Sequence, residues 1–121
     1  MSGEPLFAAM FDCSRNAVMK LETVKTFAHI LKSFGYNALL LYTEDTYEIE
    51  GEPYFGYMRG RYTKEELKEL DHYCSDLGIE LIPCIQTLAH LNQLFRWPTY
   101  NDIHESKDIL LPEEEKTYAL I

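Results

Sequence analysis

Basic residues are scarce in this chain of 121 residues, which carries 11 lysines and arginines against 20 aspartates and glutamates. The formal net charge at pH 7 is therefore -9. A surface with this charge repels polyanions over most of its area, because the phosphate backbone of a nucleic acid carries charge of the same sign. The composition therefore predicts a protein that does not bind nucleic acid.

Long apolar runs are also missing. The run nearest the N-terminus covers residues 6–11 and ends at Asp12, which is far short of the roughly 20 apolar residues that cross a membrane. No lysine or arginine precedes it, so it lacks the basic start of a secretory signal peptide. We therefore expect no membrane contact and a cytoplasmic location.

The sequence lacks the close pairs of cysteines and histidines that hold metal ions. Its three cysteines, Cys13, Cys74 and Cys84, include no Cys-x-x-Cys pair, and no two histidines lie four residues apart. An odd number of cysteines suits reduced thiols in the cytoplasm better than a disulfide framework. There is no glycine-rich phosphate loop either, so we expect neither a metal site nor a cofactor.

Three short apolar runs have the length and composition of buried strands. They cover residues 6–11, 38–42 and 79–85, and polar or charged residues follow each of them. Pro83 lies inside the third run and has no amide hydrogen to donate. It must therefore sit near a strand end or where the missing hydrogen bond is tolerated.

Helix patterns alternate with these strands. Apolar side chains at helical spacing over residues 24–34 predict an amphipathic helix that Gly35 closes. Thr63 and Glu66 match a capping box, which predicts a second helix ending at Gly78.

A third helix is expected to open with Pro112 in its first turn and three glutamates near its positive end. The apolar pattern of Tyr118, Leu120 and Ile121 continues to the last residue without a capping residue. This pattern suggests a chain cut within its third helix.

Three strand–helix units in this order predict an α/β fold with a parallel sheet and functional groups at the carboxyl ends of the strands. A complete (β/α)8 TIM barrel needs about 250 residues. The 121 residues therefore fit either a small open α/β domain or the first three βα units of a truncated barrel.

Polar residues at the first two strand ends are the first candidates for a site. Arg15 can place its guanidinium on substrate oxygens, or it can pair with Asp12 and brace its own loop. Glu44 and Asp45 are adjacent, so their side chains diverge if the strand continues. One of them can enter a pocket, although a solvated loop is the commoner fate of such residues.

Candidates after the third strand are His90 and Trp97. A lone histidine is more often structural than catalytic, and a single tryptophan usually packs under a loop, although Trp97 beside Arg96 also suits stacking on a sugar ring. The loop over residues 46–62 is longer than a plain connection requires, and long loops of this kind are often functional.

Four stretches taken together resemble a known family. "DCSR", "YTED", "RYTKEELKELDHYCSDLGIELIP" and "CIQTLAHL" occur in the order and spacing found at the start of the family 20 glycoside hydrolases, the β-N-acetylhexosaminidases. The resemblance covers nearly the whole chain, and it implies that residues 1–121 form the N-terminal part of a catalytic barrel. It also implies a substrate with terminal β-linked N-acetylglucosamine or N-acetylgalactosamine.

The resemblance assigns roles to particular residues. It implies that Arg15 binds the 3- and 4-hydroxyls of the sugar, and that Glu44, where many members carry aspartate, holds His90. Apart from the resemblance, the strand-end position of Asp45 and the aromatic pattern at Trp97 predict that both contribute to substrate binding. This chain has Cys84, Gln86, Leu88 and Ala89 at four places of the common Ile-Pro-Glu-Ile-Asp-x-Pro-Gly-His form, so it resembles a divergent branch.

Family 20 enzymes use the 2-acetamido oxygen of the substrate as nucleophile, with an Asp-Glu pair after the fourth strand. No fourth strand is expected here, so the resemblance implies a chain that is inactive alone. Its unpaired strand edges predict self-association. The alternative is a small autonomous α/β module that binds a ligand or a partner at the same strand ends.

Overall fold

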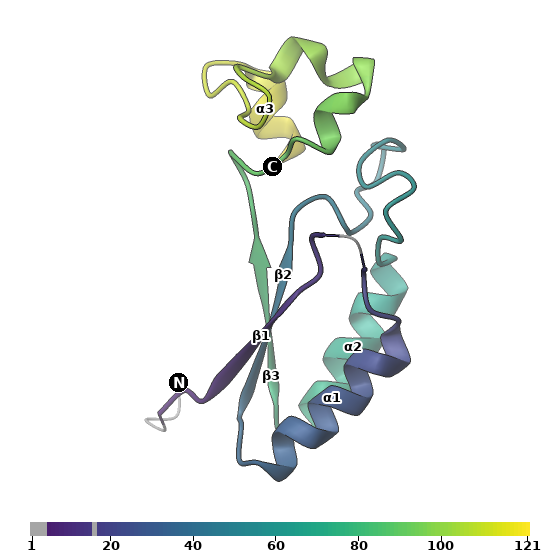
Figure 1. Ribbon diagram of the computed structural model, residues 1–121, viewed down its shortest axis with the longest axis vertical. Helices are drawn as coiled ribbons and strands as arrows, with labels where there is room; N and C mark the ends of the chain where they lie inside the picture. Colours follow the sequence, from purple (N-terminus) through teal and green to yellow (C-terminus); the bar gives the residue numbers. More distant parts are fainter. Residues whose placement is uncertain (1–4, 16) are drawn as a thin grey trace.

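The computed structural model describes residues 5–15 and 17–121. Three parallel strands form one sheet in the order β1 (Ala8–Asp12), β2 (Ala38–Thr43) and β3 (Glu80–Ile85). Helices α1 (Leu21–Ser33) and α2 (Lys64–Asp76) connect them. Both helices lie on the same face of the sheet (Figure 1). The predicted α/β architecture of successive βα units is confirmed.

The core between sheet and helices follows from the alternation of side chains along each strand. Leu39 and Leu41 of β2 point to the helices and are buried against Val24, Ala28 and the inner stripe of α2. The predicted stripe of α1 is buried only in part. Phe34 is 76% exposed, because it is the capping residue at the end of α1 and lies outside the packed turns.

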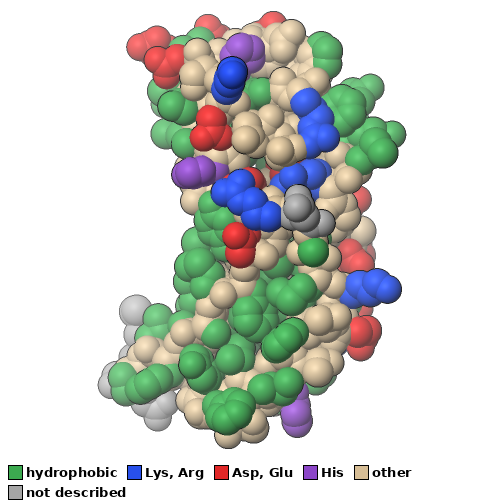
Figure 2. Space-filling model, viewed as in Figure 1, with side chains coloured by type: hydrophobic (Ala, Val, Ile, Leu, Met, Phe, Trp, Pro, Cys, Tyr) green, Lys and Arg blue, Asp and Glu red, His purple; other side chains and the backbone are tan. Residues whose placement is uncertain are grey.

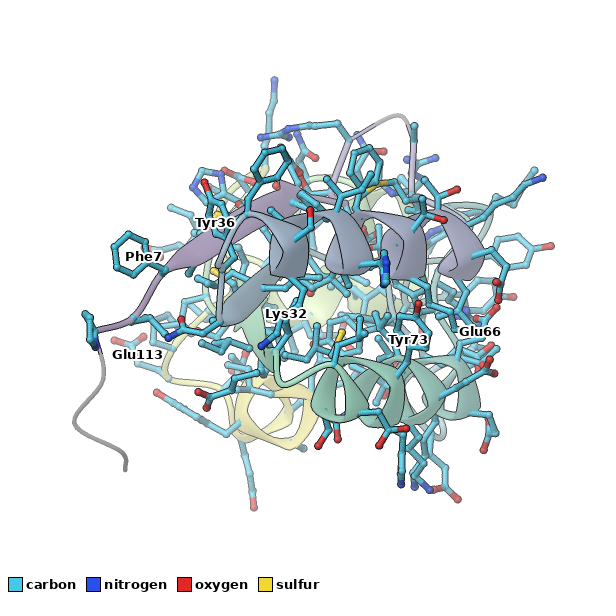
Figure 3. All side chains as sticks on the ribbon, turned by 90° about the horizontal axis from the view of Figure 1, so that it is seen from below. Phe7, Lys32, Tyr36, Glu66, Tyr73 and Glu113 are labelled. Carbon is cyan, nitrogen blue, oxygen red and sulfur yellow. The ribbon has the colours of Figure 1, made fainter. Side chains whose placement is uncertain are left out.

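The two helices pack side by side through their polar edges as well as their core faces. Figure 3 shows Lys32 and Tyr73 between the two helices. Lys32 Nζ donates to the carbonyl of Gly78 at 3.2 Å, which ties the end of α1 to the start of β3. Thr63 and Glu66 form the predicted capping box at the start of α2.

Pro83 lies in the middle of β3, opposite Leu41 of β2. The amide of Glu80 donates to Asn37 and the amide of Gln86 donates to Thr43. Even-numbered residues of β3 therefore turn their backbone groups toward β2, and Pro83 turns its nitrogen toward the free edge. The missing amide hydrogen of Pro83 therefore costs the sheet no hydrogen bond, as expected from the sequence for a tolerated proline.

The second face of the sheet has no layer packed on it by the described residues. Met10, Leu40, Tyr42 and Ile82 alternate with the core residues and so point to this face, and Met10 is 55% exposed. We call it the open face. In a closed barrel the corresponding face is the packed interior.

Residues 86–121 form a separate cap above the carboxyl ends of the strands (Figure 1). The cap contains two short 3-10 helices, Leu94–Arg96 and Pro98–Ile103, and helix α3 (Glu115–Leu120). Its core includes Leu94, Tyr100 and Leu110, packed with Phe55 of the long loop. None of the helices in the described part of the chain is long and apolar enough to cross a membrane.

The predicted start of the last helix was wrong by three residues. The helix begins at Glu115, whereas Pro112 and Glu113 lie in a turn that the amide of Glu114 closes onto Leu111. Glu114 has extended backbone angles, φ -92° and ψ 126°, so the helical run cannot include the residues before it. That the chain ends within the third helix of a barrel stays a prediction.

Candidate active site at the strand ends

The carboxyl ends of the three strands bring the predicted residues to one edge of the sheet. Asp12 ends β1 and Arg15 follows it, Glu44 and Asp45 follow β2, and Gln86 follows β3. Acidic, basic and histidine side chains gather there, between the sheet and the cap (Figure 2). This edge is where parallel α/β folds hold their ligands.

Glu44 is the buried acid of the site. Its side chain is 1% exposed, and its Oε1 lies 3.5 Å from Nη1 of Arg15, whose own side chain is 63% exposed. Neither carboxylate oxygen accepts a hydrogen bond from the described residues. Burial raises the pKa of Glu44, although Arg15 and then Arg59 oppose the shift. A buried carboxylate in this state has free acceptor positions for a ligand.

Asp45 points to a different partner. Its carboxylate is also buried, and its Oδ1 lies 3.3 Å from Nε of Arg59, which is itself only 12% exposed. Burial raises the pKa of Asp45, and Arg59 is the main group that opposes the rise. The two neighbouring carboxylates therefore diverge as expected, each toward its own arginine. Direct contact between Asp45 and a substrate stays a prediction, and its burial in this ion pair argues against it.

Arg59 joins the long loop to both strand ends. Besides facing Asp45, it donates through Nη2 to the carbonyl of Ser14, the residue before Arg15. Gly56 of the same loop has φ +64°, and a Cβ there would lie 1.9 Å from the carbonyl oxygen of Asp45. Only glycine allows the loop to approach so closely. Arg59 was not predicted, because no local spacing reveals a contact formed across 45 residues of sequence.

Asp12 braces its own loop, but its partner is Ser14 rather than Arg15. Its carboxylate accepts hydrogen bonds from the Ser14 amide at 2.8 Å and from the Ser14 hydroxyl at 2.6 Å. These bonds lower the pKa of Asp12. Arg15 is thereby left free of the Asp12 pairing and reaches Glu44 instead.

Tyr42 and Gln86 line the site on the open face. Tyr42 is in register with Asp12 on one side and with Cys84 on the other. Burial raises the pKa of Tyr42, with Glu44 adding to the rise and Gln86, through a hydrogen bond, opposing it. Gln86, which stands where the common family form has an aspartate, is therefore a neutral hydrogen-bonding partner of Tyr42. The sequence alone assigned no role to Gln86.

His90 does not contact Glu44 in this structure. Its Nδ1 lies 4.0 Å from Oδ2 of Asp108, and its side chain is 55% exposed. The backbone of His90 is left-handed, with φ 62°. The expected contact between Glu44 and His90 is thus not formed among the described residues, because Glu44 pairs with Arg15 while His90 lies beside Asp108 within the cap. The charge of His90 still acts on Glu44, as the weakest of the effects that lower its pKa.

Trp97 packs against two tyrosines of the long loop. Its ring centre lies 5.4 Å from that of Tyr54 and 5.2 Å from that of Tyr57. The guanidinium of Arg96 lies 6.0 Å from the Trp97 ring centre. The sequence singled out Trp97 and its arginine, but the two tyrosines come from a loop 40 or more residues away and could not be paired with it.

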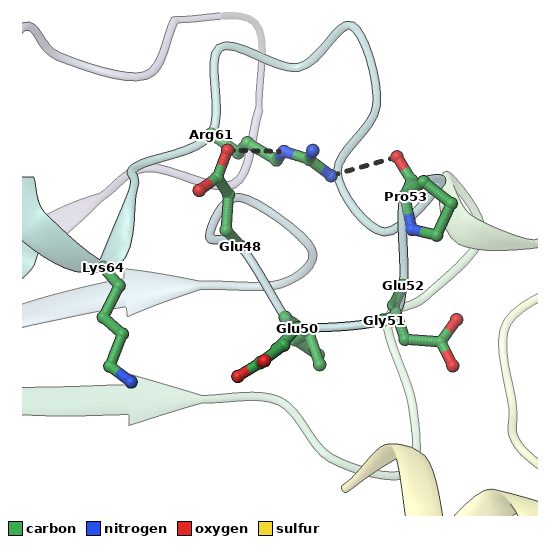
Figure 4. Close-up of a pocket in the computed structure, with 8 residues that line it drawn as sticks. Glu48, Glu50, Gly51, Glu52, Pro53, Arg61 and Lys64 are labelled. Atoms are coloured by element: carbon green, nitrogen blue, oxygen red, sulfur yellow. Dashed lines mark hydrogen bonds and ion pairs between the residues drawn. The ribbon is translucent and has the colours of Figure 1, made fainter.

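A cavity of about 670 Å³ lies within the long loop itself. Figure 4 shows Arg61 reaching Glu48 on one side and the carbonyl of Pro53 on the other, at 3.6 Å and 3.2 Å. These contacts hold the loop closed. None of the strand-end residues lines this cavity, and no group of three or more potential ligand residues in the described part of the chain is arranged to hold a metal ion.

No protein-family profile matches the chain. The chain is similar to hexosaminidase D of Homo sapiens, with 24% identity over 110 residues, and to hexosaminidase D of Bos taurus, with 27% identity over 95 residues. These matches cover 88% and 76% of this chain but only 23% and 28% of the relatives. The chain thus spans about a quarter of the length of the curated relatives.

Solved structures agree with this similarity. A β-N-acetylhexosaminidase superposes with a TM-score of 0.81 at 22% identity, covering 96% of this chain and 31% of that one. The chain folds like the start of a family 20 barrel. A glycoside hydrolase family 20 β-N-acetylglucosaminidase gives 0.74 at 19% identity, over 95% of this chain and 32% of that one.

A mutant Streptomyces plicatus β-hexosaminidase in complex with its product GlcNAc gives a TM-score of 0.77 at 22% identity, over 94% of this chain and 28% of that one. The resemblance drawn from the sequence is confirmed at the level of fold. The open face of the sheet corresponds to the barrel interior of these enzymes.

Arg59→Ala is expected to destabilise the fold by about 3 kcal/mol at pH 7, because it leaves the buried Asp45 carboxylate without its cation. The pKa of Asp45 then rises further, so the proton bound at lower pH replaces the missing charge. The loss therefore shrinks as the pH falls from 7 to 4. Urea unfolding at several pH values measures it.

Lys107→Ala serves as the control, because Lys107 is exposed and forms no hydrogen bond or ion pair with the residues that the structure describes. It should change the free energy of unfolding by less than about 0.5 kcal/mol. A loss in Arg59→Ala that stays the same from pH 7 to pH 4 would contradict the pairing with Asp45.

Glu44→Gln is expected to stabilise the fold at pH 7 by about 1 kcal/mol, because it removes a buried charge that no hydrogen bond satisfies. The raised pKa of Glu44 means that its cost is present above that pKa and disappears as the carboxyl group is protonated. The gain should therefore vanish toward pH 4. Thermal unfolding of both forms measures it, with the exposed Glu113→Gln as control.

Proposed function

We propose that this chain is the N-terminal part of a β-N-acetylhexosaminidase, an enzyme that removes terminal β-linked N-acetylglucosamine or N-acetylgalactosamine. The observation that carries the proposal is the buried Glu44 beside the exposed Arg15, at the carboxyl ends of a sheet that folds like the start of a family 20 barrel. Burial this complete without hydrogen bonds destabilises a protein, and such groups are typical of functional sites.

Arg15 is proposed to bind the sugar. Its guanidinium offers several N–H donors in a planar fork, and its 63% exposure leaves most of them free beyond the contact with Glu44. Two neighbouring hydroxyls of a pyranose can each accept one of these donors. The Glu44 carboxylate, 3.5 Å away, keeps the fork oriented toward the ligand.

Glu44 and His90 are proposed as supporting groups. Glu44 has two free acceptor oxygens that can take a hydroxyl of the sugar or an imidazole N–H. His90 now lies 4.0 Å from Asp108. Its side chain must therefore turn away from Asp108 before it can donate to Glu44. The resemblance places the acid and the carboxylate that orients the acetamido group after a fourth strand, so the described residues supply binding and support.

The chain alone is proposed to be inactive and to reside in the cytoplasm. The three cysteines are all free, with Cys13 and Cys74 fully buried, which suits a reducing compartment. Binding of the sugar ring by Arg15 alone supplies ground-state affinity and no proton transfer. Turnover therefore needs the remaining barrel units, whichever polypeptide carries them.

The decisive experiment is a chimera in which this chain replaces the first three βα units of the Streptomyces plicatus β-hexosaminidase. The chimera is expected to release 4-nitrophenol from 4-nitrophenyl N-acetyl-β-D-glucosaminide, whereas the chain alone releases none. Arg15→Ala should lower kcat/KM of the chimera by about 100-fold, the equivalent of about 2.7 kcal/mol of lost binding to the sugar hydroxyls.

Two controls separate the role of Arg15 from its charge and from folding. Arg15→Lys keeps the charge but not the fork, so it should recover only part of the loss. Lys107→Ala should leave turnover unchanged. An active chimera that is indifferent to Arg15→Ala would rule out the proposed role. A folded but inactive chimera would favour the self-contained binding module instead.

Self-association of the chain, expected from its unpaired strand edges, is favoured further by the open face, which exposes apolar side chains that a barrel would cover. The sedimentation coefficient should rise with protein concentration. Met10→Lys places a charge on this face and should weaken association by about tenfold, which corresponds to roughly 1.4 kcal/mol of apolar burial. Tyr118→Lys on α3 is the matched control, and a monomer at every concentration would contradict the expectation.

A further inference from the structure

Three aromatic side chains form one cluster on the surface beside the strand ends. Tyr54, Tyr57 and Trp97 meet with ring centres 5.2 to 5.9 Å apart. Tyr54 and Tyr57 are 44% and 45% exposed. Trp97 is half-buried and lies against both of them, so it supports the two tyrosine rings that face the solvent. We call these three residues the aromatic platform.

The platform is held rigidly by its own loop. The amide of Tyr57 donates to the carbonyl of Tyr54 at 3.2 Å, and the amide of Arg59 donates to the carbonyl of Gly56 at 3.1 Å. Two successive turns thus fix both tyrosines before any ligand arrives. Rings that are already ordered lose little conformational entropy on binding.

The chemistry of the platform combines aromatic faces with polar groups at their edges. Two phenol hydroxyls border the rings, and the exposed Arg96 lies 6.0 Å from the Trp97 ring centre. A pyranose ring has the complementary form, with C–H groups on one face and hydroxyls at the rim. A purely apolar partner would leave these hydroxyls and the guanidinium without hydrogen bonds.

The platform is continuous with the strand-end site. Only Met58 separates Tyr57 from Arg59, and Arg59 contacts Asp45, the neighbour of Glu44. Gly56, between the two tyrosines, touches the backbone of Asp45. Figure 2 shows hydrophobic side chains projecting at the side of the molecule where this loop lies, next to the group of basic side chains.

We propose that the aromatic platform binds a further sugar of a β-linked N-acetylglucosamine oligosaccharide whose terminal sugar is bound at Arg15 and Glu44. The identity of the sugar rests on the proposed function, and the platform itself rests on the aromatic geometry. The consequence is a preference for oligosaccharides over a single N-acetylglucosamine. Nothing in this binding step requires the rest of a barrel.

Trp97 is the single tryptophan of the chain, so its fluorescence reports on the platform directly. Titration of the 121-residue chain with tri-N-acetylchitotriose is expected to give a saturable change in emission, and N-acetylglucosamine a markedly weaker one. Tyr54→Ala and Tyr57→Ala should each weaken the binding of the trisaccharide by about tenfold. Tyr54→Phe and Tyr57→Phe, which keep the rings, should retain most of the affinity.

Phe34→Ala is the matched control, since Phe34 is an exposed aromatic at the far end of α1, and it should bind as the parent chain does. Circular dichroism of each variant verifies the fold. The proposal is overturned if the trisaccharide gives no saturable change, or if the tyrosine variants bind as tightly as the parent. It is equally overturned if emission changes on dilution alone and sugar has no effect, which would make the platform a contact between copies.

The same titration keeps this inference apart from the proposed function. Binding that Arg15→Ala abolishes but the tyrosine variants leave intact would keep the strand-end site and remove the platform. Binding that the tyrosine variants abolish and Arg15→Ala leaves intact would support a sugar platform even if the chimera had no activity.

Discussion

The contact between Arg59 and the two strand ends is the interaction on which the candidate site depends. One guanidinium pairs with the buried Asp45 and donates a hydrogen bond to the carbonyl of Ser14, so it holds the backbone on both sides of the Arg15–Glu44 pair. Without it, the long loop would have no charged anchor over the sheet. The close approach of Gly56 to the backbone of Asp45 also holds the long loop against this strand end.

Glu44 and Asp45 have different partners because of the backbone conformation at the end of β2. Adjacent residues leaving a strand point in different directions, so two carboxylates one residue apart enter two environments. Asp45 meets an almost buried arginine, which offsets much of the cost of its own burial. Glu44 meets an exposed one, and both of its oxygens keep free acceptor positions. The first arrangement anchors the loop, and the second leaves a buried carboxylate whose oxygens accept no hydrogen bond from the described residues.

Much of the fold was readable from local pattern. The capping box at Thr63 and Glu66, the apolar runs of the strands and the stop at Gly35 are set by residues near one another in sequence. The site was readable only in part. Arg15 and Glu44 were placed at strand ends by position, and the structure brings their side chains within 3.5 Å of each other, while their roles stay a prediction. Arg59 escaped prediction, and so did the packing of Tyr54 and Tyr57 on Trp97, because the path of the long loop decides these contacts. The last helix was placed too early for a similar reason, since the turn at Pro112 is closed by a backbone hydrogen bond that composition does not reveal.

Pro83 has a further consequence for how this sheet behaves while its outer edge is uncovered. An exposed parallel edge is a template on which any extended segment can add a strand, and newly made α/β chains are vulnerable to this error during synthesis. A proline in the middle of β3, with its nitrogen turned outward, removes a donor from the centre of that template. A foreign strand that added to this edge would lack one backbone hydrogen bond at Pro83. Pro83 therefore weakens incorrect strand addition at the outer edge of β3, while the pairing of β3 with β2 keeps all of its hydrogen bonds.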